Sequence, residues 1–197
     1  INDFPGPGNV MARVAAAKKF CEKHGIRCET RVFASAPLAM QVMLSGELEV
    51  AYTPPEVVIQ AVLQGSPLKV IASGFTRSPF FLAIGNHVEL PNAARGYPEV
   101  IKDLRGKKIG VPARGSAAEF LLKSMLKDAG LSPTDVVIVA SGAPNTTYPS
   151  LQARQLDAAV TFTPAEAFCR VLASCRIAVD TSTGEGPANF AATTGMS

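Results

Sequence analysis

The chain has 197 residues, of which 47% are hydrophobic and 18% charged, and its formal net charge is +3. This composition suits one large or two small globular domains and excludes a disordered chain or a coiled coil. The small charge, carried by scattered Lys and Arg residues, does not indicate nucleic-acid binding, and no apolar stretch approaches the roughly 18 residues of a membrane span.

In chain order, the first part begins with a Pro/Gly-rich loop at 1–9 and then alternates between predicted helices and strands. The expected elements are a helix at 10–23, a strand at 26–33, a helix at 38–44, a strand at 48–52, a helix after 55 and a strand at 68–76. Gly46 is suited to end the helix at 38–44 in the left-handed conformation. The equivalent position further along the chain holds Arg154, for which that conformation is strained, so we expect the two helix ends to differ.

The second part continues the alternation, apart from a polar segment at 86–99. The expected elements are strands at 80–85, 107–111, 136–140, 156–162 and 176–179, with helices at 117–129, at 149–155 and after 165. Alternation of this kind predicts an α/β fold with mainly parallel sheets.

A Thr-Pro-x-Glu sequence occurs twice, at 53–56 and at 163–166, 110 positions apart. It predicts a helix start, with Thr as N-cap, Pro at the first helical position and Glu as capping partner. A helix, a turn and a strand precede each copy, and a helix and a strand follow it. We therefore expect a duplicated α/β half. Residues 116–119 form a third predicted capping box.

The four cysteines form two close pairs, Cys21 with Cys28 and Cys169 with Cys175, each across a helix-to-strand turn. Two local disulfides would suit an oxidising compartment. Buried free thiols are the alternative, because free cysteine packs as a small hydrophobic residue. Neither pair has Cys-x-x-Cys spacing and the chain has two histidines, so we expect no metal site.

The segment 103–111, followed by Arg114-Gly115-Ser116 and a long helix, resembles the hinge-proximal segment of periplasmic solute-binding proteins. The closest resemblance is to the nitrate/sulfonate/taurine-type family of ABC transporters. Residues 155–159 resemble the Gly-Gln-x-Asp-Ala step of that family, with Arg154 in place of the glycine, and residues 44–49 match the corresponding step of the first lobe.

The resemblance implies a two-lobe α/β fold of the type II periplasmic-binding-protein class, with a parallel-sheet core in each lobe. Lobe one is expected at 1–78 and lobe two at 79–197, including a return crossover at 189–194. The first strand of lobe one is expected to be missing or reduced to Ile1, and lobe one to be incomplete, so the chain is expected to be a fragment or an incomplete description of a longer protein.

The implied function is capture of a small, anionic solute between the lobes for an ABC importer. The implied partner is a membrane permease, and the implied location is the periplasm, with the signal peptide removed or not included in the sequence. The protein is expected to be a monomer without a cofactor. A cytosolic enzyme or an effector-sensing domain on the same fold is the alternative. Enzymatic activity is not expected, because neither a catalytic Cys or His nor a Gly-rich phosphate loop is found at the expected cleft.

In such a fold, ligands meet the loops at the carboxyl ends of strands, where helix N-termini present free N–H groups. The candidate ligand-binding residues are Ser35, Ala36, Tyr52, Thr53, Phe80, Arg114, Gly115, Ser116, Asn145, Phe162 and Thr163. Each has an alternative: the Thr and Ser residues can serve only as caps, the aromatic residues can be core, and Arg114 can be a solvated loop residue.

The three glutamates at 56, 119 and 166 are interpreted as capping partners, and they oppose a bound anion at their helix N-termini. Ser35 begins a helix without such a glutamate and is therefore the cleanest predicted anion site. Arg114 is the best-placed cation for a carboxylate or sulfonate.

Overall fold

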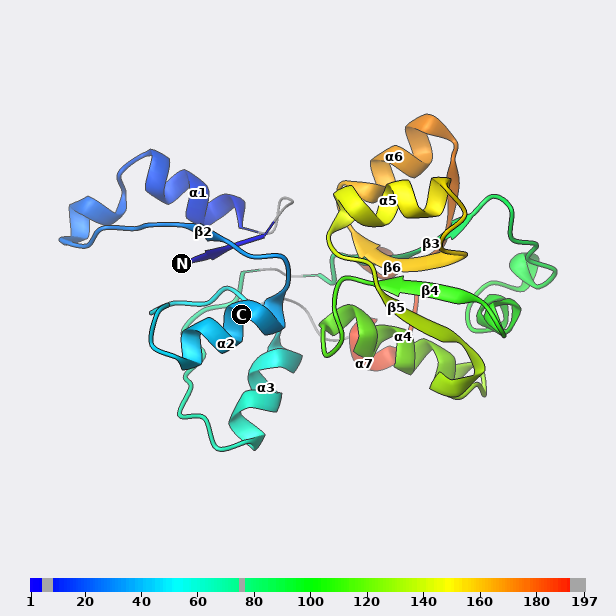
Figure 1. Cartoon of the computed structure of the whole chain (residues 1–197), viewed down its shortest axis with the longest axis horizontal. Coiled ribbons are helices and arrows are strands. Elements are labelled where there is room, and N and C mark those ends of the chain that lie inside the picture. Colours follow the sequence, from blue (N-terminus) through cyan, green and yellow to red (C-terminus); the bar gives the residue numbers. More distant parts are fainter. Residues whose placement is uncertain (5–8, 75–76, 192–197) are drawn as a thin grey trace.

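The computed structural model describes residues 1–4, 9–74 and 77–191. Figure 1 shows two groups of elements side by side. We call them the N-terminal group (β1 to α3) and the C-terminal group (β3 to α7). This arrangement fits the predicted lobes, although their boundary at residue 78 remains a prediction.

The N-terminal group is built from short elements. They are β1 (Asn2–Asp3), α1 (Val10–Ala17), a 3₁₀ turn (Cys21–His24), β2 (Arg31–Val32), α2 (Ala36–Leu44) and α3 (Pro55–Leu63). The strands β1 and β2 pair in parallel over two residues each, so the first strand extends beyond Ile1 but remains minimal. Two small apolar clusters hold the group together, one around Phe33 and one around Met40.

The strands predicted at 48–52 and 68–76 do not form over their described residues, and the strand predicted at 26–33 shrinks to two residues. Residues 75 and 76 lie outside the description. A strand exists only when a neighbour completes its hydrogen-bond ladder, and none of the described segments pairs with these two. Several of their apolar residues remain open to solvent, as Ile71 does with 82% of its surface exposed, whereas Leu48 is buried in the cluster around Phe33.

The C-terminal group is a five-stranded sheet covered by helices on both faces (Figure 1). Its strands are β3 (Phe80–Gly85), β4 (Lys108–Val111), β5 (Val137–Ala140), β6 (Ala158–Phe162) and β7 (Cys175–Asp180). Its α-helices are α4 (Ala117–Asp128), α5 (Pro144–Gln152), α6 (Ala165–Leu172) and α7 (Ala188–Ala191). The sheet order is β5-β4-β6-β3-β7, with β3 antiparallel to both neighbours and the parallel strands β4, β5 and β6 on one side.

Alternation along β3 divides its side chains between two cores, because successive strand residues face opposite sides of a sheet. Leu82 and Ile84 face the larger core, into which α4 packs Leu121 and Leu122. Phe81 and Ala83 face the smaller core under α5 and α6. All six residues of β3 are buried, as expected for the centre of a sheet.

The two equivalent helix ends adopt the same conformation, so the expected difference between them is wrong. Gly46 has φ +84° and Arg154 has φ +56°. The same backbone hydrogen bond closes both turns: Glu47 N–H donates to Val42 O (3.2 Å), and Gln155 N–H donates to Ser150 O (2.9 Å). The turn geometry therefore holds Arg154 in the conformation that glycine favours.

Both cysteine pairs form disulfides, so the buried-thiol alternative is excluded. The predicted crossover at 189–194 is helical over its described part, in α7, and its remaining residues lie outside the description. Among the described helices, none is long and apolar enough to cross a membrane.

Candidate functional site

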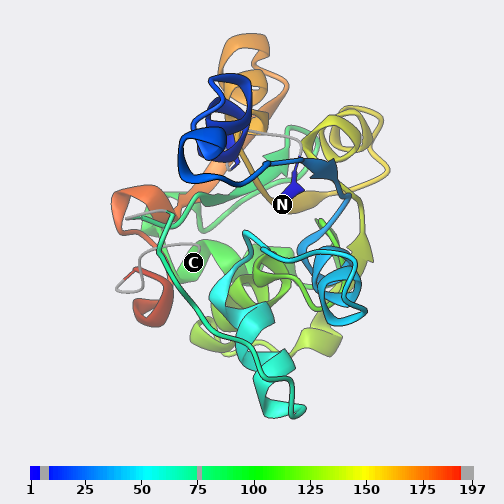
Figure 2. The same cartoon turned by 90° about the vertical axis from the view of Figure 1, so that its left-hand side faces the viewer.

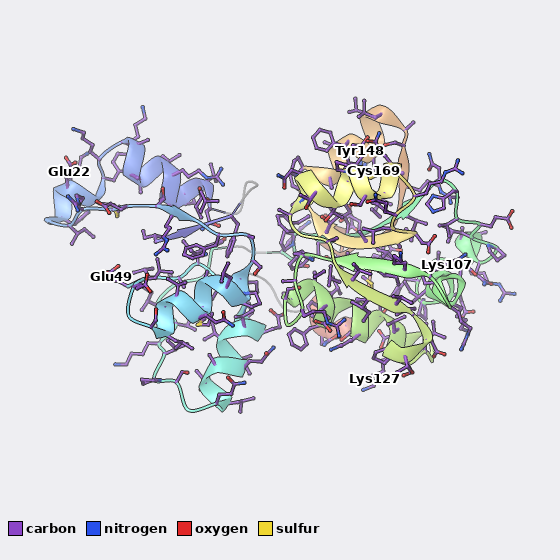
Figure 3. The ribbon with its side chains drawn as sticks, viewed as in Figure 1. Glu22, Glu49, Lys107, Lys127, Tyr148 and Cys169 are labelled. Carbon is purple, nitrogen blue, oxygen red and sulfur yellow. A yellow bond between two sulfur atoms is a disulfide. The ribbon has the colours of Figure 1, made fainter. Side chains whose placement is uncertain are left out.

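The parallel strands β4, β5 and β6 end at the same edge of the sheet, and α4, α5 and α6 begin there. Lys107, immediately before β4, lies at the opposite edge, remote from the N-terminal group (Figure 3). The edge where these helices begin therefore faces the N-terminal group, and we call it the facing edge. Figure 2 shows α2 and α3 in front of it, and α3 contacts α4.

The turn between β4 and α4 is organised around Glu119. Its side chain is only 3% exposed, and its carboxylate accepts the Gly115 N–H (2.6 Å) and pairs with Lys123 Nζ (2.9 Å). The Ser116 hydroxyl accepts the Glu119 N–H at 3.4 Å, which confirms Ser116 as the cap, but the predicted capping box is incomplete because the Glu119 carboxylate accepts from Gly115 N–H and not from Ser116 N–H. Gly115 has φ +75°, which a side chain would strain.

Arg114 also belongs to this turn. Its side chain is 58% exposed and its Nη2 lies 3.2 Å from a Glu119 carboxylate oxygen. Its Nη1 lies 3.4 Å from the carbonyl oxygen of Ile138 in β5. Arg114 is thus partly engaged by the chain itself, and its role as a ligand anchor remains a prediction.

The turn between β6 and α6 differs from the predicted cap. The N-cap position is Pro164 and no side chain caps the helix, while the Thr163 hydroxyl donates to Glu166 Oε1 at 2.7 Å. The second Glu166 oxygen, Oε2, is buried without a hydrogen-bond partner in the described part of the chain. Thr163 and Glu166 therefore bind each other rather than the helix backbone.

The same correction applies to α3 in the N-terminal group. Its N-cap is Pro54, because the following Pro55 holds Pro54 in an extended conformation and the helix begins one residue later than predicted. Thr53 is 2% exposed, and its hydroxyl has no partner among the described residues.

The other candidates in the N-terminal group lie on its connecting segments. Ser35 is the N-cap of α2 without a side-chain bond, and Ala36 is the first residue of that helix. Tyr52 is tied to the first strand, since its N–H donates to Asn2 Oδ1 (2.5 Å) and its carbonyl accepts from Asn2 Nδ2 (2.8 Å). Burial raises the pKa of the Tyr52 phenol to about 12.

The aromatic candidates of the C-terminal group belong to its core. Phe80 is buried, and its ring meets the Phe162 ring edge to face with centroids 6.1 Å apart. Asn145 is exposed on the first turn of α5. The sheet thus joins Phe80 to Phe162, and the remaining candidates are distributed over separate turns.

Sequence reasoning missed Thr161. It is 1% exposed and lies on β6 opposite Phe81, and its hydroxyl has no partner within the described ranges. The signal was present: strand alternation places residue 161 on the same face as residue 163, toward α5 and α6.

Glu56, at the start of α3, carries a carboxyl group that is partly desolvated. Burial raises the pKa of its carboxyl group, and one carboxylate oxygen has no partner among the described residues.

We expect Glu56→Gln to raise the free energy of unfolding at pH 7 by on the order of 1 kcal/mol, because it removes a desolvated charge. With the folded-state pKa raised, the folded protein binds more protons than the unfolded chain, so the wild type loses stability as the pH rises above about 4.5. Urea unfolding of both proteins at pH 4 and pH 7 measures this. A gain that is no larger at pH 7 than at pH 4 would contradict the explanation.

A hollow of about 550 Å³ adjoins the facing edge beside α6. We call it the α6 hollow. The residues that line it include Phe81, Thr163, Glu166, Arg170, Asp180 and Ser182.

The sequence matches the model of the NMT1/THI5-like family over residues 10–190. The chain belongs to the NMT1/THI5-like family. A Brucella abortus (strain 2308) protein that carries the name putative binding protein is a similar sequence. It is 31% identical over 152 residues, which cover 77% of this chain and 43% of the relative. The chain therefore spans less than half the length of this relative.

Solved structures share the fold. A protein of Bordetella bronchiseptica RB50 matches with TM-score 0.75 and 22% identity, over 91% of this chain and 55% of its own. The alkanesulfonate-binding protein SsuA of Xanthomonas axonopodis pv. citri, bound to MOPS, matches with TM-score 0.73 and 19% identity, over 90% and 58%. The periplasmic nitrate-binding protein NrtA of Synechocystis PCC 6803 matches with TM-score 0.67 and 15% identity, over 90% and 49%. The predicted family and type II fold are confirmed.

Proposed function

We propose that this chain is the solute-binding part of an ABC importer and captures a small solute between the N-terminal and C-terminal groups. The observation that carries the proposal is the facing edge, where three helices begin opposite the N-terminal group. Helix N-termini supply free N–H groups and a positive potential, and closure of two lobes is a common way to enclose a ligand. Membership of a family with binding-protein relatives supports it.

The proposed contacts are those of the predicted candidates, with an anionic group of the solute near the N-termini of α2 and α5. These two helices have no acidic residue in their first turn, in contrast to α3, α4 and α6. Ser35 and Asn145 are the polar side chains there. Arg114 is the proposed cation, despite its contact with Glu119.

The proposal includes a periplasmic location, a membrane permease as partner and a monomeric state. Two disulfides support an oxidising compartment, where such bonds persist. The relatives with named solutes support transport rather than catalysis.

Arg114→Ala tests the site. If Arg114 anchors an anionic group, the variant should bind the solute released from the purified protein about 2–5 kcal/mol more weakly, the scale for truncating a buried charge partner. Mass spectrometry identifies that solute, and calorimetric titration measures its affinity. Arg95→Ala, which removes an exposed arginine near Glu99, is the matched control. Affinity of Arg114→Ala within about 0.5 kcal/mol of wild type, on the scale of surface substitutions, would remove Arg114 from the site.

A further inference from the structure

Glu166 and Thr163 form a pair that can only accept hydrogen bonds from a ligand. The Thr163 hydroxyl has one hydrogen, and it is donated to Glu166 Oε1 at 2.7 Å. An ionised carboxylate has no hydrogen to donate, so what remains for a ligand is lone pairs on both side chains. Glu166 Oε2 is already removed from solvent and has no partner in the part of the chain that the structure describes.

The residues that line the α6 hollow do not neutralise the charge of Glu166. The cation among them, Arg170, pairs with Asp180, with Nη2 3.6 Å from Oδ2. No ion pair to Glu166 is found among the described residues, which leaves this wall of the hollow negative. A desolvated carboxylate oxygen without a donor is costly, so a turn of the Glu166 side chain toward the hollow, where it can take a donor from outside the chain, is expected to be favourable.

Glu119 shows how the chain satisfies a glutamate in the first turn of another helix. Its oxygens receive the Gly115 N–H (2.6 Å) and Lys123 Nζ (2.9 Å). Four residues after Glu166 the chain has Arg170, as Lys123 follows Glu119, but Arg170 pairs with Asp180 instead. Glu166 therefore lacks the donors that the chain itself supplies to Glu119.

A second observation points to the same place. The Thr161 hydroxyl is almost completely buried without a partner in the described ranges, and it lies opposite Phe81, which lines the α6 hollow. Buried hydroxyl groups are normally bonded. Thr161 on β6 and Glu166 on α6 thus both retain unused bonding capacity.

We infer that Glu166 determines specificity by binding an N–H donor group of the solute, of the ammonium or amidinium class, with Thr163 as a second acceptor. The inference rests on the proposed solute-binding function and extends it, because a simple inorganic anion has no such group. Glu166 also offsets the positive end of α6, so an anion gains little at this helix. The anionic end of the solute belongs instead at the helices that begin without a glutamate.

The test uses the whole chain and matched probes that differ only in the donor. Benzylamine is compared with benzyl alcohol, ethylamine with ethanol, and ethanesulfonate serves as the anion, each by calorimetric titration. Wild type is expected to bind at least one amine more than tenfold tighter than its alcohol. Glu166→Gln should abolish this preference, with a loss of roughly 30-fold or more for the amine, as for a truncated charge partner. Glu22→Gln, which removes an exposed charge from the N-terminal group, should leave the affinities for all probes unchanged.

Mass spectrometry of the solute released from the wild-type protein distinguishes failure of the Glu166 inference from failure of the proposed solute-binding function. A released solute with an amine or amidine group supports the inference. A released solute without an N–H donor overturns it and leaves the proposed function standing, as does tight binding of ethanesulfonate with no amine preference. If no solute is released and no probe binds, both fail. Circular dichroism melting of Glu166→Gln verifies its fold, and the comparison of probes on wild type is independent of the variant.

Discussion

Replacing Cys169 and Cys175 together by alanine is expected to lower the free energy of unfolding by about 2–4 kcal/mol. The disulfide joins α6 to β7 across six positions, and both cysteines are buried in the core beneath α5 and α6. Figure 3 shows Cys169 beside Tyr148 in this layer. The substitution removes the covalent constraint and leaves a small cavity, and both effects destabilise.

The control is the double alanine variant of Cys21 and Cys28. Its disulfide spans seven positions, so the effect on chain entropy is similar, but both cysteines lie outside the buried clusters. Urea unfolding should show the smaller loss for this variant. Equal losses would mean that burial of the Cys169–Cys175 disulfide contributes nothing.

Glu119→Gln is expected to cost about 1.5–3 kcal/mol at pH 7, because it weakens charge-assisted hydrogen bonds within a buried turn. Burial alone would raise the pKa of Glu119, but hydrogen bonds from Lys123 and Gly115 and the charges of Lys123 and Arg114 outweigh it, and the pKa is lowered. The isosteric glutamine keeps the shape of the turn, so the loss reports on charge.

The pH dependence follows from the sign of this shift. A carboxyl group with a lowered folded-state pKa stabilises the protein above its unfolded value, and this contribution is lost as the pH falls. The difference between wild type and Glu119→Gln should therefore be full at pH 7 and shrink below about pH 4.5. Chemical unfolding of both proteins at pH 7 and below about pH 4.5 measures this difference in the free energy of unfolding. A difference that does not change with pH would show that the geometry of the turn rather than the charge of Glu119 is responsible.

The sequence predicted the C-terminal group well because its signals are local and mutually consistent. The all-buried strand at Phe80–Gly85 lies where an apolar run predicted it, and Ser116 caps α4 as its spacing with Glu119 indicates. The cysteine pairs were left open between thiols and disulfides, and only the relative position of their sulfur atoms decided for disulfides.

The failures concern features that depend on a distant partner or on one residue of register. Residues 48–52 have strand character, but a strand needs a neighbouring strand, and propensity does not supply one. Thr53 was predicted as a cap because of its spacing to Glu56, yet the second proline moved the helix start by one residue. Strand alternation could have placed Thr161 on the α6 face, but the missing hydrogen-bond partners of the Thr161 and Glu166 oxygens were not predictable, because they depend on every neighbour in space.

The central place of β3 has a consequence for the order of folding. It is the first strand of the five-stranded sheet to leave the ribosome, yet Leu82 pairs with Val160 on one side and Val179 on the other. Until those partners are synthesised, both edges of the apolar strand β3 are unpaired. Bringing β6 and β7 to β3 closes long loops, and the entropic cost of this closure comes before the new contacts stabilise the sheet. The C-terminal group is therefore completed late, when β7 joins the strand that was made first.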